Sequence, residues 1–182
     1  MTSNFFFNQE KFFLDEELTK SLLARYETIF KDGIYKTTHE NIREINSYSI
    51  SSEPLFESVM NKINIKFQTI INASDLKFNK LWLVSTKSNN SIKTILPYIP
   101  HIDKQRYLKA MVYLHDISKD HGPIHLGKVK STIDIEKKRK NLPNNYKIKG
   151  LNTIDEKYLE TQMTPMVGSS GDVVFFDTNT PH

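Results

Sequence analysis

The stretch Ser91-Ile-Lys-Thr-Ile-Leu-Pro-Tyr-Ile-Pro-His-Ile-Asp103 ends in a histidine and an aspartate two residues apart, His101 and Asp103. Side chains alternate between the two faces of a β-strand, so this pair points to one side if the segment is extended. A neutral imidazole and a carboxylate that reach the same point in space are a typical pair of metal ligands. Because His-x-Asp is a short motif, the interpretation depends on what else the chain supplies.

The run Gly171-Asp-Val-Val-Phe-Phe-Asp-Thr-Asn-Thr-Pro-His182 supplies a second histidine directly after an apolar segment that predicts a strand. Two histidines and one carboxylate, with other coordination positions open, form the facial triad of non-haem Fe(II) oxygenases. We therefore predict that His101, Asp103 and His182 bind iron and form the catalytic centre. The alternative is a surface histidine, a capping aspartate and a frayed terminal histidine.

Asp177 is a rival carboxylate, because it lies close to His182 in the sequence. Asp103 is preferred, since it shares a strand face with His101. We expect Asp177 to make local turn hydrogen bonds, to Thr178 or Asn179.

Residues 82–182 resemble the Fe(II)/2-oxoglutarate-dependent oxygenase superfamily, and most closely its phytanoyl-CoA dioxygenase-like branch. The motifs are the His-x-Asp pair, Tyr113-Leu-His-Asp116 with His121-Gly-Pro-Ile124, and Gly171–Asp177 leading into Pro181-His182. The resemblance implies a double-stranded β-helix, or jelly roll. It also implies hydroxylation of a small-molecule substrate by O₂, coupled to oxidative decarboxylation of 2-oxoglutarate to succinate and CO₂. The implied cofactors are Fe(II) and 2-oxoglutarate, with ascorbate as a reductant.

Members of this family usually carry an Arg or Lys beyond the distal histidine that pairs with the far carboxylate of 2-oxoglutarate. The sequence ends at His182, so we expect this residue and the last strand to be missing from it. Either the sequence is a truncated form of the protein, or another cation substitutes. The candidate cations are Lys93, Arg106 and Lys109. We assign cofactor binding to Lys93, to Lys109 and to Tyr98, which closely precedes the ligand strand. The alternative function is a jelly-roll module that holds a metal or ligand without turnover.

Hydrophobic periodicity predicts a mostly β member of the α+β class, with two helices packed on the outer face of a sheet. The first helix spans 15–31, with Asp15 as its N-cap, and the second begins at 52 or 53, with Pro54 in its first turn. Residues 1–14 are rich in aromatic side chains, and we expect at most a short strand there. Residues 34–51 are polar and rich in Ser, Asn and Thr, which predicts a loop with one strand at most. Strands are predicted over 78–84, 92–98, 107–114, 124–126, 164–167 and 172–176.

We predict one domain over residues 1–182. Residues 1–75 form a helical support region, and residues 76–182 form the jelly-roll core, with an insertion over 128–162.

Composition excludes several classes of protein. The chain has no cysteine, so it has no disulfide framework, and any metal must be held by His, Asp or Glu. No apolar run is long enough to span a membrane, and we expect a cytoplasmic protein. The net charge of +4 does not by itself indicate nucleic-acid binding, and the run Lys137–Lys140 predicts a solvated face. A zinc pair from His121 and His125 is not expected, because Gly122-Pro123 forbids a regular helix between them.

Overall fold

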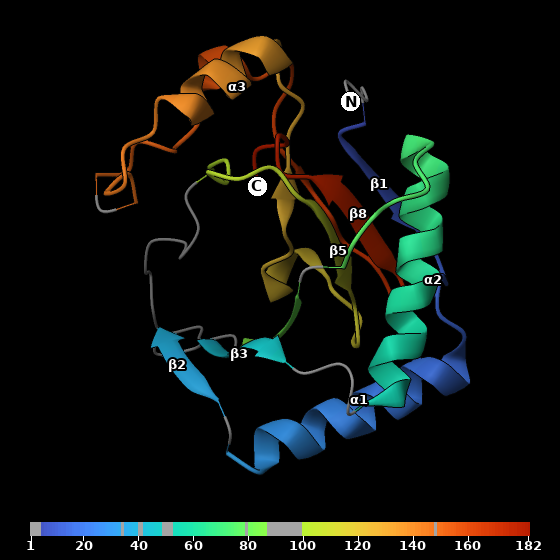
Figure 1. The fold of residues 1–182 in the computed structure, drawn as a ribbon. Helices are drawn as coiled ribbons and strands as arrows, with labels where there is room; N and C mark the ends of the chain where they lie inside the picture. Colours follow the sequence, from blue (N-terminus) through green and yellow to red (C-terminus); the bar gives the residue numbers. More distant parts are fainter. Residues whose placement is uncertain are drawn as a thin grey trace.

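The computed structural model describes residues 5–33, 35–39, 42–48, 53–78, 80–86, 100–147 and 149–182 of the chain. Strands and short helices alternate along these ranges (Figure 1). In chain order they are β1 (Phe7–Glu10), α1 (Glu16–Lys31), β2 (Lys36–His39), β3 (Ile42–Tyr48), α2 (Pro54–Ile71), β4 (Leu81–Thr86), β5 (Leu108–Val112), the 3-10 turn η2 (Lys119–His121), β6 (His125–Leu126), α3 (Thr132–Lys140), the 3-10 turn η3 (Glu156–Tyr158), β7 (Thr164–Pro165) and β8 (Val173–Asp177).

Strand β8 is the centre of the fold. It pairs antiparallel with β1 on one side and with β5 on the other, and all five of its residues are buried. Such a strand is covered on both faces, which explains its continuous apolar sequence Val-Val-Phe-Phe. Val173 and Phe175 belong to a large core cluster, and Val174 and Phe176 belong to a second cluster on the other side.

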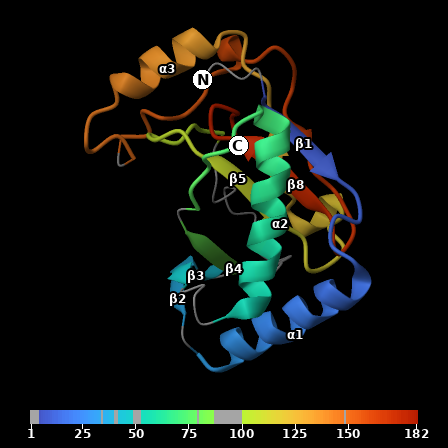
Figure 2. The same ribbon diagram turned by 45° about the vertical axis from the view of Figure 1, so that its right-hand side comes forward.

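Helices α1 and α2 cover one face of this sheet (Figures 1 and 2). Asp15 caps α1 by accepting a hydrogen bond of 2.8 Å from the amide of Leu18. Helix α2 begins at Pro54, slightly later than the predicted start at 52 or 53, and the proline lies in its first turn as predicted. The ring of Phe67 from α2 packs edge-on against Phe175 of β8, with centroids 5.1 Å apart. The predicted helices and their packing on a sheet are therefore confirmed.

A second antiparallel sheet, in the order β2-β3-β4, corrects the prediction for residues 34–51. That segment was predicted to hold one strand at most, because it is rich in Ser, Thr and Asn. It contains the two strands β2 and β3, and β3 pairs along β4. Pairing with a neighbour satisfies backbone groups whatever the side chains are, so the tertiary context overrode the local composition. The predicted strand over 78–84 begins later, at Leu81.

The segment from 128 to 162 is packed against the sheet region through a third apolar cluster. Val129, Ile135 and Ile154 of this segment surround Ile102, which is fully buried between His101 and Asp103. Helix α3 lies at the end of the molecule opposite to α1 (Figures 1 and 2). The predicted insertion thus buries the segment that carries the candidate ligands.

The structure is a mixed fold of many strands and few helices, and the jelly-roll barrel stays a prediction. The described strands form sheets of three, three and two members, and not two facing four-stranded sheets. The predicted strand over 92–98 lies outside the described residues. Within the described ranges, no helix has the length and apolar character needed to cross a bilayer.

Candidate metal centre

The backbones of His101 and His182 are joined directly, although the residues are far apart in the sequence. Each amide donates a hydrogen bond of 3.1 Å to the carbonyl of the other residue. Residues whose backbones are paired in this way project their side chains to the same side of the two segments. The two imidazole rings accordingly lie with centroids 4.6 Å apart.

Asp103 completes the cluster from the same segment as His101. Its Oδ2 lies 3.8 Å from Nε2 of His182. One ligand atom each from His101, Asp103 and His182 lies within 4.8 Å of the other two, and all three residues are partly exposed. In the part of the chain that the structure describes, no other group of three such residues converges in this way.

Hydrogen bonding orients the ring of His182. Its Nδ1 lies 2.9 Å from the carbonyl oxygen of Thr180. A carbonyl can only accept, so we assign the proton to Nδ1. The lone pair of Nε2 then faces Asp103, which is the orientation a metal ligand requires.

The protonation states also suit a metal ligand set. Burial, followed by the nearby charge of Lys109, lowers the pKa of His182 to about 4, so the ring is neutral at pH 7. Burial opposes ionisation of Asp103, but the charge and hydrogen bond of Lys109 outweigh it and keep the pKa of this carboxyl below its ordinary value. Metal binding requires a neutral imidazole and an ionised carboxylate, and both are present.

Lys109 is the cation of this cluster. It lies on β5 opposite Phe176 of β8, and the ring of Phe176 packs on His182 with centroids 5.3 Å apart. The Nζ of Lys109 is 2.6 Å from Oδ2 of Asp103 and 3.5 Å from Nε2 of His182. Of the three residues predicted to contact 2-oxoglutarate, Lys109 is therefore at the cluster. Lys93 and Tyr98 lie outside the described residues.

Arg139 connects α3 to both ligand segments, and the sequence analysis missed it. Its guanidinium donates to the carbonyl of Asp103 at 2.8 Å and to the carbonyl of Thr178 at 3.2 Å. The run Lys137–Lys140 was interpreted as a solvated face, yet Arg139 is buried. Its position four residues after the fully buried Ile135 puts both on one helix face, and this spacing was the signal available in the sequence.

Two further polar contacts hold the ligand segments. Asn152 accepts from the amide of Ile102 through its carbonyl, and its side chain donates to the carbonyl of Ile102. The guanidinium of Arg106 pairs with both carboxylate oxygens of Asp177, at 2.6 Å for the closest contact. Asp177 also accepts from the amide of Asn179, as predicted, so this rival carboxylate is engaged away from the cluster.

The donor set of two imidazole nitrogens and one carboxylate oxygen fits a divalent iron with open coordination positions. It also fits other first-row divalent ions, since affinity for such a site follows the general order of these metals. The chemistry of the residues therefore supports a metal site of the non-haem iron type.

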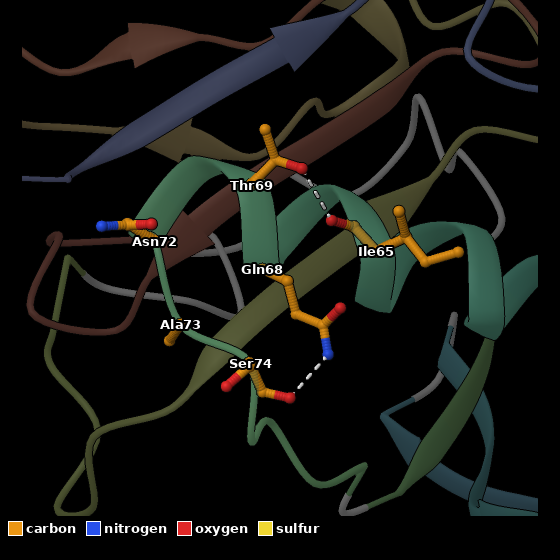
Figure 3. Close-up of a pocket in the computed structure, with 6 residues that line it drawn as sticks. All are labelled: Ile65, Gln68, Thr69, Asn72, Ala73 and Ser74. Carbon is orange, nitrogen blue, oxygen red and sulfur yellow. Dashed lines mark hydrogen bonds between the residues drawn. The ribbon is translucent and has the colours of Figure 1, made fainter.

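A separate shallow hollow lies at the end of α2 (Figure 3). Its polar groups bond to each other, because Gln68 donates to the carbonyl of Ser74 and Thr69 donates to the carbonyl of Ile65. It contains none of the clustered residues, and it offers no convergent titratable group for chemistry. It is lined by Ile65, Gln68, Thr69, Asn72, Ala73 and Ser74.

No protein-family model and no curated protein sequence matches this chain. The solved structures similar to it include two complexes with a metal and 2-oxoglutarate (alpha-ketoglutarate), and a prolyl-4-hydroxylase. One is the epimerase SnoN, in complex with Fe³⁺, alpha-ketoglutarate and nogalamycin RO, which is 15% identical to this chain with a TM-score of 0.67. The match covers 97% of this chain and 71% of the SnoN chain.

HygX from Streptomyces hygroscopicus, bound to nickel, 2-oxoglutarate and hygromycin B, is 12% identical with a TM-score of 0.56, covering 98% of this chain and 76% of its own. A prolyl-4-hydroxylase from Pseudomonas putida is 12% identical to this chain with a TM-score of 0.53, and the match covers 98% of this chain and 84% of the hydroxylase chain. At these identities the likeness shows that the chain shares its fold with these three proteins.

Proposed function

We propose that this chain is a non-haem Fe(II)- and 2-oxoglutarate-dependent oxygenase that hydroxylates a small molecule with O₂. The observation that carries the proposal is the convergence of His101, Asp103 and His182 in a fold similar to that of such enzymes. We assign it to the phytanoyl-CoA dioxygenase-like branch on the motifs in its sequence, chiefly Gly171–Asp177 leading into Pro181-His182.

In this proposal the three clustered side chains hold the metal. Bound there, iron supplies the oxidative chemistry, in which decarboxylation of 2-oxoglutarate to succinate and CO₂ is coupled to hydroxylation. The chain itself keeps His182 neutral and aimed by its bond to Thr180, and keeps Asp103 ionised. These are preorganised ligand positions, which reduce the ordering needed when the metal binds.

Lys109, Lys93 and Tyr98 are the proposed contacts to 2-oxoglutarate. The dianionic co-substrate needs a cation close to the metal, and Lys109 is supported by its position beside Asp103 and His182. On β5, Met111 shares the face of Lys109 and is 38% exposed.

A small-molecule substrate is supported by two of the similar proteins. SnoN and HygX were each solved with a small molecule bound, nogalamycin RO and hygromycin B respectively. SnoN is described as an epimerase, so a reaction other than hydroxylation belongs in the assay.

The test combines metal content with turnover. The purified chain is loaded anaerobically with Fe(II), and succinate release is measured with 2-oxoglutarate, ascorbate, O₂ and candidate substrates. His101→Ala, Asp103→Ala and His182→Ala should each lose metal and succinate release, whereas His125→Ala, which removes a histidine outside the cluster, should keep both. Unchanged metal content in the three cluster variants would refute the assignment.

A second candidate function is a metal-binding module without turnover. It is favoured by the ion pair of Lys109 with Asp103, because this pair engages the cation that 2-oxoglutarate would need. A chain that binds Fe(II) but neither binds 2-oxoglutarate in calorimetry nor releases succinate would support this alternative.

A further inference from the structure

Lys109 holds the same two atoms that a metal in the proposed centre would use. Its ammonium is 2.6 Å from Oδ2 of Asp103 and 3.5 Å from Nε2 of His182. A divalent metal bonds to such oxygen and nitrogen ligands at about 2.0–2.2 Å. An ammonium in hydrogen-bond contact with the same carboxylate oxygen occupies the space that this metal needs.

The ion pair of Lys109 with Asp103 is partly buried, which strengthens the attraction between the two charges. The side chains of Lys109, Asp103 and His182 are 32%, 24% and 8% exposed. Charges that are partly buried attract and repel more strongly than charges in bulk water, because screening is weaker there. A metal cation and the ammonium of Lys109 therefore also repel one another if both stay at the centre.

Resting on the function proposed above, we infer that Lys109 is an internal competitor of the metal. Its ammonium neutralises Asp103 until a divalent cation displaces it, and the side chain must then turn away from the ligands. The triad consequently binds metal more weakly than the same ligands would without this lysine. Lys109 acts as a positioning residue that sets the metal affinity through Asp103.

The experiment compares metal affinity in matched variants. Co(II) binding is measured by calorimetry for the wild-type chain, Lys109→Met and Lys104→Met, each shown to be folded by thermal melting in EDTA. Lys104 is the control because it is close in sequence and carries the same charge, but it donates to Asn144 and not to the cluster. Lys109→Met should bind Co(II) about 10- to 100-fold more tightly, the range expected for loss of one charge-assisted hydrogen bond to a ligand. Lys104→Met should stay within about twofold of the wild type, because its ammonium donates to Asn144 and not to a metal ligand.

A second measurement on the wild-type chain does not depend on the variant. The rate of acetylation of Lys109 by acetic anhydride, followed by peptide mass spectrometry, should rise when Co(II) is added, because the amine is released from Asp103. Lys104 should react at an unchanged rate. If Lys109→Met does not fold, this measurement decides.

The outcomes separate the two proposals. Co(II) binding of equal or lower affinity in Lys109→Met, or an unchanged acetylation rate of Lys109, overturns the competition and leaves the metal centre standing. Co(II) binding by neither the wild type nor Lys109→Met overturns the metal centre itself.

Discussion

The environment of His182 acts on the pKa of its ring in opposite directions. Burial and the charge of Lys109 disfavour its protonated form, while the hydrogen bond to the carbonyl of Thr180 favours it, and the first two prevail. The ring, whose side chain is 8% exposed, is consequently neutral and oriented by its hydrogen bond to Thr180. Because the folded chain disfavours the protonated ring, its stability without metal should depend on pH.

The stability of the chain in EDTA should fall as the pH falls from 6.5 to 4. The pKa of His182 is lowered from 6.5 to about 4 in the folded chain, so the unfolded chain binds a proton more readily in this window. The contribution is fully present above pH 6.5 and amounts to up to about 3 kcal/mol. Urea unfolding at each pH should show it in the wild type and in His125→Asn, but not in His182→Asn. Equal pH dependence in all three would contradict this account of the ring.

At the scale of elements, the turn before β8 has no room for a side chain at Gly171. Gly171 has φ of +90°, and a Cβ at this position would lie 2.8 Å from the carbonyl oxygen of Leu14. The amide of Leu14 donates to the carbonyl of Gly171 at 3.1 Å, so the two backbones are in direct contact. Only glycine combines this backbone conformation with this close approach.

Gly171→Ala should therefore destabilise the fold by about 2–3 kcal/mol in urea unfolding. Gly33→Ala is the matched control, because Gly33 also has a positive φ, of +77°, but nothing lies within 4 Å of its added Cβ. It should cost only about 1 kcal/mol. Similar losses in the two variants would show that the contact with Leu14 contributes nothing.

Helix α3 acts on the centre through Arg139. Arg139→Met removes the donor shared by the carbonyls of Asp103 and Thr178, and it should destabilise the chain by about 2–3 kcal/mol. It should also weaken metal binding, since both ligand segments lose the same anchor. Lys140→Met, at the exposed neighbouring position, should change stability by less than about 0.5 kcal/mol. A metal affinity unchanged in Arg139→Met would limit α3 to a packing role.

At the scale of the molecule, the centre joins segments that are distant in the sequence. His101 and Asp103 precede β5, and His182 follows β8, so a metal bound by all three would cross-link the two strands' ends. A ligand that binds only the folded state stabilises it according to its concentration. Divalent metal at about 100 times its Kd should therefore raise the free energy of unfolding by about 2.7 kcal/mol.

This stabilisation should appear as a higher midpoint of thermal unfolding with Co(II) and should be reversed by EDTA. Asp103→Ala should melt at the same temperature with and without the metal. If Co(II) raised the unfolding midpoint of Asp103→Ala as much as that of the wild type, the metal would bind elsewhere.

The single-domain assignment of residues 1–182, with its support region, core and insertion, stays a prediction. Strand β1 nevertheless belongs to the predicted support region and pairs with β8 of the predicted core. The support region is thus not purely helical, and its first strand is part of the central sheet.

The sequence by itself determined the elements whose signals are local. The cap at Asp15, the proline at 54 and the apolar run at 173–176 act within a few residues, so α1, α2 and β8 were predicted. It also indicated His101, Asp103 and His182 as a cluster, because their types and setting match a known pattern. Only the tertiary structure decided that β2 and β3 are strands, that Arg139 is buried, and that Lys109 lies on Asp103. Each of these depends on a partner outside the segment itself: β3 pairs with β4, Arg139 donates to Asp103 and Thr178, and Lys109 of β5 meets an aspartate that precedes the strand. Periodicity within a segment does not record which partner outside it will be met.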